Sequence, residues 1–226
     1  MSDETPLRTI SLFEKLPDAE LAAVAASCTI RTFEKQAQIL GEQEKTTDVF
    51  FILSGSVRAT SYTSAGREVI FNEIPAGAIF GEFSAVDGLP RASSVVALTD
   101  CRVARMTRDK FLHMLEGNGR IAVRLAQVLV AKMRAMSERV FEVSALAVRE
   151  RVRRELLRLA KEGTTFRNGI VIRPAPTHYE IAARIGSHRE AVTREFNRLE
   201  SENIVEVRRR QIRIIDIERL KSPDDE

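Results

Sequence analysis

The sequence predicts an α+β fold in three parts: an antiparallel β-roll of the jelly-roll kind, one long helix, and a helix-turn-helix that ends in a hairpin. Three observations support this prediction. Short apolar runs alternate with turn residues from Ile30 to Met106, which is typical of antiparallel strands. Apolar residues then recur in heptad steps after Arg120. Two helix-start patterns follow in close succession from Thr177 onward.

The composition is that of an ordinary globular protein. Of 226 residues, 44% are hydrophobic and 30% are charged, which excludes a disordered chain, a collagen and a disulfide-rich mini-protein. The length suits one large domain or two small ones. Cys28 and Cys101 form no C-x-x-C pattern, so we expect no metal, no iron–sulfur cluster, and two reduced, buried thiols in a cytoplasmic protein. We expect no signal peptide in residues 1–9 and no membrane-spanning segment.

The net charge of +3 hides an uneven distribution along the chain. Residues 1–145 carry 17 basic and 18 acidic side chains, whereas residues 146–226 carry 18 basic and 14 acidic ones. Three of those acids form the tail Asp224-Asp225-Glu226, without which the C-terminal part reaches +7. A basic C-terminal third indicates a polyanionic partner, although arginines on a solvated surface give the same count.

Helical residues open the chain and strands follow. Residues 7–29 have a helical pattern with a helix start at Pro17. The strands expected next cover residues 49–53, 57–62, 69–74 and 78–80. Gly55, Gly66 and Gly77 stand between them at an eleven-residue step, and glycine accepts turn conformations that other residues resist. This regularity favours a coiled β-roll.

A short helix over residues 111–115 leads to a long helix, predicted from about Arg120 to Val143. The apolar residues in heptad steps are Ala122, Ala126, Leu129, Met133, Met136, Val140 and Val143. Leu125 and Val128 supply a second apolar flank. One face would suffice for packing on the β-roll, so two faces favour a parallel coiled-coil homodimer. We expect the three parts to cover residues 1–119, 120–145 and 146–226.

The first motif with chemical meaning is Phe80-Gly81-Glu82-Phe83 followed by Leu89-Pro90-Arg91-Ala92-Ser93-Ser94. A strand, a short helical turn and a second strand would gather backbone N–H groups and the Arg91 guanidinium around one point. Such groups bind phosphate. Glu82 is suited to accept a hydrogen bond from a sugar hydroxyl. The alternative is a buried Glu82–Arg91 pair that only ties two strands together.

The second motif is a helix-turn-helix. Thr177 and Glu180 form a capping box, and Gly186 ends the first helix. Ser187 and Glu190 form a second capping box that opens the next helix at once. The outer side of that helix presents Arg189, Glu190, Thr193, Arg194, Asn197 and Arg198, which are residue types that read base edges. Alternatively, Glu190 only caps Ser187, and Arg198 pairs with Glu195 or Glu202 on a solvated face.

The rest of the C-terminal third is predicted as a helix over residues 151–161, a strand over residues 170–172 and a terminal hairpin. The hairpin strands, residues 204–207 and 211–215, flank the triplet Arg208-Arg209-Arg210. A basic hairpin tip behind a helix-turn-helix is a wing, and its arginines are expected to contact phosphates. A solvated turn is the alternative.

The run from Phe80 to Ser94 resembles the phosphate-binding cassette of cyclic-nucleotide-binding domains, written F-G-E-[LF]…P-R-A-[AS]-[ST]. The β-roll with its turn glycines is also similar to that domain. The resemblance implies that Arg91 binds the cyclic phosphate with help from the N–H groups of Ala92 and Ser93. It also implies that Glu82 binds the ribose 2′-hydroxyl, while Gly81 and Phe83 shape the loop.

From about Leu12 to Asp216 the chain resembles the cyclic AMP receptor / fumarate–nitrate regulator (CRP/FNR) family of bacterial transcription factors. The Arg189-Glu190-x-x-x-Arg194 pattern implies a TGTGA-like half-site in double-stranded DNA. The residues expected to contact DNA are Thr177, His188, Arg189, Glu190, Thr193, Arg194, Arg208 and Arg209. The family also implies a homodimer and RNA polymerase as a partner. The cluster cysteines of the fumarate–nitrate branch are missing, which favours the nucleotide-binding branch.

The sequence departs from the cyclic AMP receptor on the ligand side. Met136-Ser137 replaces a Thr-Ser pair, and Lys132 replaces an arginine. Asn72 stands where a small polar residue can touch the base. Ala92 suits cAMP, because cGMP-selective cassettes often have threonine there. The expected ligand contacts are Gly81, Glu82, Phe83, Arg91, Ala92, Ser93, Lys132, Met136, Ser137 and Asn72. The ligand is expected to be cAMP, with cGMP, another ligand or none as alternatives.

The expected mechanism is a population shift in which the ligand bridges the cassette and the long helix through Arg91, Glu82 and Ser137. The helix then moves at a joint over residues 145–149, and two recognition helices reach major grooves about 34 Å apart. A cyclic-nucleotide-binding regulatory subunit of another protein is an alternative. An enzyme is not expected, because no Ser/His/Asp or Cys/His set is recognisable.

Overall fold

The computed structural model describes residues 6–166 and 169–222, and the acidic tail at 224–226 lies outside them. The chain forms two compact units, Met1–Met133 and Arg134–Glu226. The three-part division at residues 119 and 145 stays a prediction. Within the described residues, no helix is both long and apolar enough to cross a membrane.

The N-terminal segment is less regular than predicted. Instead of a helical pattern throughout residues 7–29, two short 3-10 turns, η1 (Pro6–Thr9) and η2 (Ser11–Phe13), precede helix α1 (Asp18–Ala26). Leu7, Ile10, Leu12 and Phe13 are all buried, and this close spacing of buried residues does not fit one stripe of a regular helix. The predicted helix start at Pro17 is confirmed.

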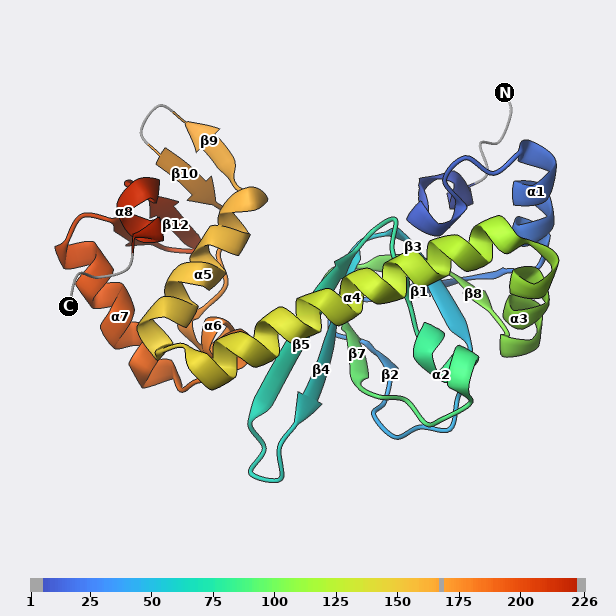
Figure 1. Ribbon diagram of the computed structural model, residues 1–226, viewed down its shortest axis with the longest axis horizontal. Helices are drawn as coiled ribbons and strands as arrows, with labels where there is room; N and C mark the ends of the chain where they lie inside the picture. The colour runs from blue at the N-terminus through green and yellow to red at the C-terminus, as the bar shows by residue number, and fades with distance from the viewer. Residues whose placement is uncertain (1–5, 167–168, 223–226) are drawn as a thin grey trace. The chain divides into compact units, whose positions relative to one another are not determined.

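Eight antiparallel strands form the β-roll of the first unit (Figure 1). They are β1 (Thr29–Phe33), β2 (Gln38–Leu40), β3 (Val49–Ser54), β4 (Ser56–Tyr62), β5 (Glu68–Pro75), β6 (Ile79–Phe80), β7 (Ser94–Ala97) and β8 (Cys101–Met106). Their order is β1-β8-β3-β6 in one sheet and β2-β7-β4-β5 in the other. The predicted antiparallel sandwich is confirmed.

Successive side chains of strand β3 pack on opposite faces of its sheet. Phe50 and Ile52 are buried among residues of both sheets, whereas Val49 and Phe51 belong to a second cluster formed with helices. This alternation follows from the two-residue period of a strand. The helices of the first unit are α1, α2 (Glu82–Asp87), α3 (Arg108–Gly117) and the beginning of α4 (Gly119–Ala145). Cys101 is buried, whereas Cys28 is half-buried rather than buried as expected.

Helix α4 runs without interruption from the first unit into the second (Figure 1). Ile121 and Leu125 are buried in the helix-side cluster of the β-roll, and Val128 packs against it. Leu125 and Val128 therefore form the inner flank that the sequence predicted. The C-terminal residues of the heptad stripe are exposed instead, with Met133 at 63% and Val140 at 62% of their surface accessible.

The second unit combines the end of α4 with a helical core and a four-stranded sheet of order β11-β12-β10-β9. Its further elements are α5 (Val148–Lys161), β9 (Thr164–Phe166), β10 (Gly169–Ile172), α6 (His178–Ile185), α7 (Arg189–Ser201), β11 (Val205–Arg208), β12 (Gln211–Ile214) and α8 (Ile217–Lys221). Strand β9 was not predicted, because its three residues are exposed and Phe166 alone gives no alternating apolar pattern. Val152, Leu156, Phe196 and Leu199 lie at the centre of the core.

The two capping boxes predicted for the helix-turn-helix had different outcomes. The first is confirmed, since Thr177 accepts from the Glu180 N–H at 3.2 Å and donates its own N–H to the Glu180 carboxylate at 2.8 Å. The second is wrong, since α7 begins at Arg189 and its N-cap is His188. The N–H of Ser187 instead donates to the carbonyl of Ala182 at 2.9 Å, which closes the end of α6.

Two of the turn glycines differ in the space available for a side chain. Gly55 and Gly66 both have a positive φ, of +85° and +74°. A Cβ on Gly55 would lie 2.4 Å from the Asp100 carbonyl oxygen, whereas a Cβ on Gly66 would meet nothing within 4 Å. We expect Gly66→Ala to lower the free energy of unfolding by about 1 kcal/mol and Gly55→Ala by about 3 kcal/mol or more, because overlap adds to backbone strain. Urea denaturation checks this, and equal losses would contradict the structure.

Candidate functional site

The site in the first unit is built around a buried guanidinium. Arg91 is only 2% exposed, although its side chain is charged. Its Nε donates to the Thr46 hydroxyl, its Nη1 to the Gly81 carbonyl and its Nη2 to the Asp48 carbonyl, each at 2.9 Å. A guanidinium has five N–H groups, so these three bonds leave one N–H on each terminal nitrogen. Two N–H groups on one fork match two oxygens of a phosphate.

The loop between β2 and β3 holds this arginine from the main-chain side. The Gln43 N–H donates to the Arg91 carbonyl and the Arg91 N–H donates to the Glu44 carbonyl, both at 2.9 Å. The Asp48 carboxylate is in turn held by Arg105 at 2.6 Å. Thr46 and Asp48 could not be predicted from the sequence as partners of Arg91, because nothing local links them to a residue more than forty positions away.

Burial lowers the pKa of Arg91, and the nearby carboxylates of Asp48, Glu44 and Glu82 act in the opposite direction. An arginine stays protonated at neutral pH even when buried. The site therefore keeps a fixed positive charge in a region shielded from water, where attraction to an anion is stronger than at the surface.

Glu82 is 2% exposed and pairs with a residue of the long helix rather than with Arg91. Lys132 Nζ lies 2.6 Å from Glu82 Oε1 and donates to the Ile79 carbonyl at 3.3 Å. The same ammonium stands 5.7 Å from the centre of the Phe83 ring. Within the described residues the structure therefore contradicts a Glu82–Arg91 ion pair. It brings Lys132 to the cassette, whereas contact of Lys132 with the ligand stays a prediction.

Gly81 is required by both conformation and space. Its φ is +81°, and an added Cβ would lie 2.8 Å from the Asp48 carbonyl oxygen and 2.9 Å from Arg91 Nη1. Any other residue would push the arginine away from its carbonyl partners. The predicted role of Gly81 in shaping the loop thus has a steric basis in this structure.

The remaining residues predicted to contact the ligand differ in position. Phe83, Ala92 and Asn72 are exposed on the first unit, and Ser93 is half-buried there. Met136 and Ser137 lie on the part of α4 that belongs to the second unit. Contact of these two residues with the ligand stays a prediction.

A second candidate site is the outer face of α7 in the second unit. Val192, Phe196 and Leu199 are buried, which leaves Arg189, Glu190, Arg194 and Asn197 exposed. Among the described residues, neither Arg189 nor Arg194 forms an ion pair, so both guanidinium groups are available to a partner. Glu190 does not cap Ser187.

Arg198 is different from these two arginines. It pairs with Glu195 at 2.9 Å and with Glu202 at 3.0 Å along its own helix, which is the structural role considered as the alternative. The pairs hold the guanidinium along the helix surface. Arg198 is therefore a weaker candidate for a contact outside the protein than Arg189 or Arg194.

His178, at the start of α6, is a further residue next to the recognition surface, one that the sequence motif did not indicate. Its Nδ1 lies 2.9 Å from the hydroxyl of Thr193, and its ring stacks on Phe196 with the ring centres 4.5 Å apart. Burial lowers the pKa of His178, and the positive charge of Arg189 lowers it further. The neutral imidazole thus links α6 to the recognition face of α7. The Thr177 hydroxyl is used for capping.

The tip between β11 and β12 carries the basic triplet. Arg208, Arg209 and Arg210 are all exposed, and Arg210 has a positive φ of 56°. Arg208 pairs with Glu206 at 2.6 Å within the hairpin. Arg209 is thus the more accessible of the two predicted phosphate contacts. In the described part of the chain, no group of three or more His, Cys, Asp or Glu is arranged to hold a metal ion.

Two regions of the chain, one around each candidate site, match known protein families. Residues 30–118 match the family described as the cyclic nucleotide-binding domain. Residues 150–222 match the Crp-like helix-turn-helix domain. The chain belongs to the CRP/FNR family of transcription regulators. This is a family of regulators and not of enzymes.

Relatives of this CRP/FNR regulator match it along most of their length. The cAMP-activated global transcriptional regulator CRP of Salmonella typhimurium is 29% identical over 83% of this chain and 90% of the relative. The CRP-like cAMP-activated global transcriptional regulator of Mycobacterium tuberculosis is 26% identical over 95% and 96%. The c-di-GMP responsive regulator CLP of Xanthomonas campestris has a similar fold, with a TM-score of 0.79 at 17% identity, over 88% of this chain and 99% of that one.

The position of His178 leads to a pH prediction. Its lowered pKa means that the folded regulator binds a proton less readily than the unfolded chain below pH 6.5. The contribution of His178 to the free energy of unfolding should therefore be fully present above pH 6.5 and be lost as the pH falls from there through its folded pKa. The groups that act on this imidazole are Arg189 and Glu200.

The chain has three histidines, so an NMR titration can follow His178 individually. We expect it to titrate below 6.5, and we expect Arg189→Gln to raise its pKa because a positive charge is removed. Arg194→Gln is the control and should leave the pKa of His178 unchanged. A pKa of His178 at or above 6.5 would contradict the interpretation.

Proposed function

We propose that this regulator is a homodimer that binds a cyclic nucleotide, cAMP in the first place, and then recognises a TGTGA-like pseudo-palindromic DNA site. The observation that carries the ligand part is the pre-positioned Arg91 guanidinium, buried and held by three oxygens with one N–H left on each terminal nitrogen. A rigid donor fork loses little entropy on binding a phosphate, which favours affinity.

The second polar group of the cassette supports a ligand with a ribose. The Glu82 carboxylate is buried and lies close enough to Arg91 to act on its pKa. Lys132 occupies one of its oxygens, and a carboxylate has further lone pairs that can accept from a hydroxyl. A ligand hydroxyl at Glu82 would therefore act directly on Lys132, and through it on α4.

The choice of cAMP rests on two indications. Ala92 follows Arg91 in the cassette, as it does in domains of that specificity, and relatives that cover most of the chain are described as cAMP-activated. Binding of cGMP or of another ligand is an alternative outcome of the experiment below. So is a protein that acts without any ligand.

DNA recognition is supported by the exposed face of α7. Arg189 and Arg194 have no ion-pair partner within the described chain, and Glu190 stands exposed beside them. Arginine reads guanine through its O6 and N7 atoms, and glutamate accepts from the amino group of cytosine. Arg209 at the hairpin tip is suited to a phosphate contact. A DNA-binding regulator would work in the bacterial cytoplasm, with RNA polymerase as its protein partner.

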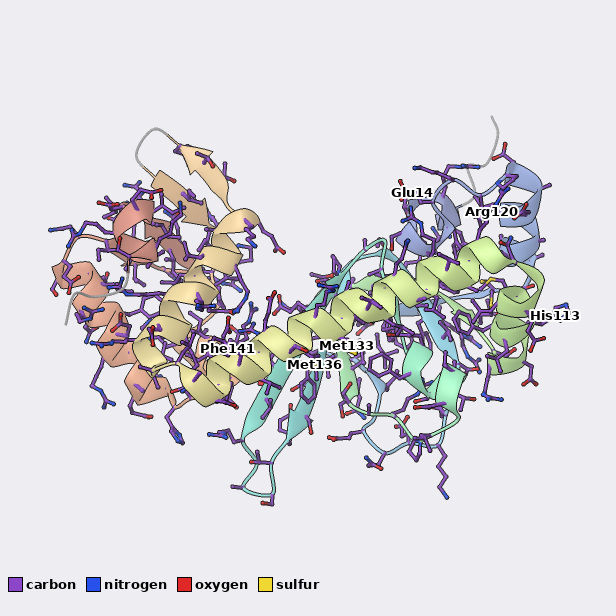
Figure 2. All side chains as sticks on the ribbon, viewed as in Figure 1. Glu14, His113, Arg120, Met133, Met136 and Phe141 are labelled. Carbon is purple, nitrogen blue, oxygen red and sulfur yellow. The ribbon has the colours of Figure 1, made fainter. Side chains whose placement is uncertain are left out.

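Dimerisation is supported by the exposed stripe of α4. Figure 2 shows Met133 and Met136 along this helix, and 63% and 56% of their surfaces are accessible. Val140 and Val143 continue the same heptad stripe and are 62% and 50% exposed. Burial of each such side chain contributes about 1.5–3 kcal/mol. The matching stripe of a second copy would cover this one in a parallel coiled coil.

Calorimetry with cAMP and with cGMP tests the ligand. We expect Arg91→Gln to weaken binding at least a hundredfold, because the fixed charge and the donor fork are both lost. Arg58→Gln is a matched control, since Arg58 belongs to the same β-roll but pairs with Glu73. Thermal unfolding of each variant shows that it is folded. No binding heat from either nucleotide with the wild-type protein would overturn the ligand proposal.

Affinity for a duplex with two TGTGA half-sites tests recognition. We expect Arg189→Ala with Arg194→Ala to weaken specific binding by about 2–6 kcal/mol in total, from about 1–3 kcal/mol for each base contact. Arg198→Ala is the control, because that arginine pairs within its own helix, and its effect should be much smaller. Unchanged affinity of the double variant would mean that α7 does not read the site.

A further inference from the structure

We propose that Glu155 is a positioning residue that couples the last turns of α4 to the helix-turn-helix, so that a change in α4 alters how α7 is presented to DNA. This inference rests on the ligand-gated regulator proposed above. It adds the residue that transmits the signal within the second unit, where the end of α4, α5 and α6 meet.

Glu155 lies at the centre of contacts from three helices. Its carboxylate is 2% exposed, and it accepts from Arg139 on α4 at 2.8 Å and from Arg158 on α5 at 3.0 Å. Arg184 on α6 reaches its other oxygen at 3.3 Å. One carboxylate thus ties the end of α4 to the first helix of the helix-turn-helix.

A second buried acid extends the same junction. Glu142 on α4 is 3% exposed, and it pairs with Arg158 and lies 3.6 Å from Arg154, both on α5. Arg139 lies 3.7 Å from Glu142 on the same helix. The junction therefore contains two carboxylates and four arginines, with a net charge of +2.

An apolar contact supports the same connection. A Cβ built on Gly186 would lie 3.5 Å from Val143 of α4 and 3.7 Å from Nη1 of Arg151. Arg151 donates to the Ile185 carbonyl at 2.6 Å, at the turn before α7. The turn between the two helices of the motif therefore lies next to Val143 of α4.

The physics of buried charge explains why this junction can transmit a movement. Burial alone would raise the pKa of Glu155, but Arg139 and Arg184 outweigh it, so that the pKa is lowered and the carboxylate stays charged. Loss of a partner by a buried charge is strongly destabilising, because the remaining charge is left uncompensated in a region shielded from water. Even a partial separation of Arg139 or Arg184 from Glu155 is therefore unfavourable. When α4 moves, either α6 moves with it or both contacts break together.

A merely structural ion cluster would have a different signature. It would change the free energy of unfolding and leave the effect of the ligand on DNA affinity unchanged. A coupling residue alters the ratio of DNA affinities with and without ligand, while the free protein still binds the ligand normally. The experiment measures this ratio.

The first variant is Glu155→Gln, which keeps the side-chain size and removes the charge. We measure cAMP affinity of the free full-length protein by calorimetry, and affinity for a TGTGA duplex with and without cAMP. We expect cAMP affinity within twofold of wild type and a ligand-dependent gain in DNA affinity reduced at least tenfold. Glu162→Gln, at the exposed end of α5, is the matched control and should keep the full gain.

The second variant is Arg139→Gln, which removes the α4 contact alone and serves if Glu155→Gln does not fold. Arg158 and Arg184 still hold Glu155 in this variant. Its control is Arg120→Gln, an exposed arginine at the start of the same helix. Figure 2 shows Arg120 at the end of α4 away from Phe141. We expect Arg139→Gln to reduce the gain at least tenfold, and its combination with Glu155→Gln to add little.

The outcomes separate the two proposals. A wild-type protein whose DNA affinity does not depend on cAMP overturns the gated regulator. A wild-type gain that persists in folded Glu155→Gln or Arg139→Gln overturns the coupling role alone. Loss of stability with an unchanged gain also overturns it, since the cluster is then only structural.

Discussion

The burial of one guanidinium determines how the first unit is arranged. A charge removed from water must be surrounded by polar partners, because an unpaired one is too costly to keep. Arg91 meets this requirement with the Thr46 hydroxyl and with the carbonyls of Gly81 and Asp48. The β2–β3 loop and the turn before α2 are thereby fixed to one side chain. The partners are main-chain carbonyls and a hydroxyl, so the positive charge is not neutralised by a direct ion pair. A phosphate can supply that counter-charge.

In the second unit the most buried charges are negative, and they too need polar partners. Its most buried charges are carboxylates, Glu155 and Glu142, and arginines from three helices surround them. The arginines outnumber the acids here, so none of the acids lacks a partner. Positive charge that exceeds this need is found at the exposed Arg189 and Arg194 of α7. The net charge of the C-terminal part therefore has two components, an internal one that joins helices and an external one on the exposed face of α7, which we propose reads DNA.

The sequence predicted the features that depend on neighbouring residues. The capping box of Thr177, the positive φ of Gly55 and the inner flank of α4 are all set within a few residues. It could not predict Thr46 and Asp48 as partners of Arg91, because chain folding brings them together from distant positions. The second capping box failed for a similar reason, since the Ser187 N–H is taken by the closing turn of α6. The Arg139–Glu155 contact likewise depends on two helices meeting.

Helix α4 contributes residues to both units. Lys132 of this helix pairs with Glu82 of the cassette. Arg139, two turns further along α4, pairs with Glu155 of α5. Arg139 and Glu142 each stand one residue before a member of the exposed stripe, Val140 and Val143. The proposed coiled coil and the junction would therefore share the same turns of α4, so that packing against a second copy would act on the residues that hold the helix-turn-helix.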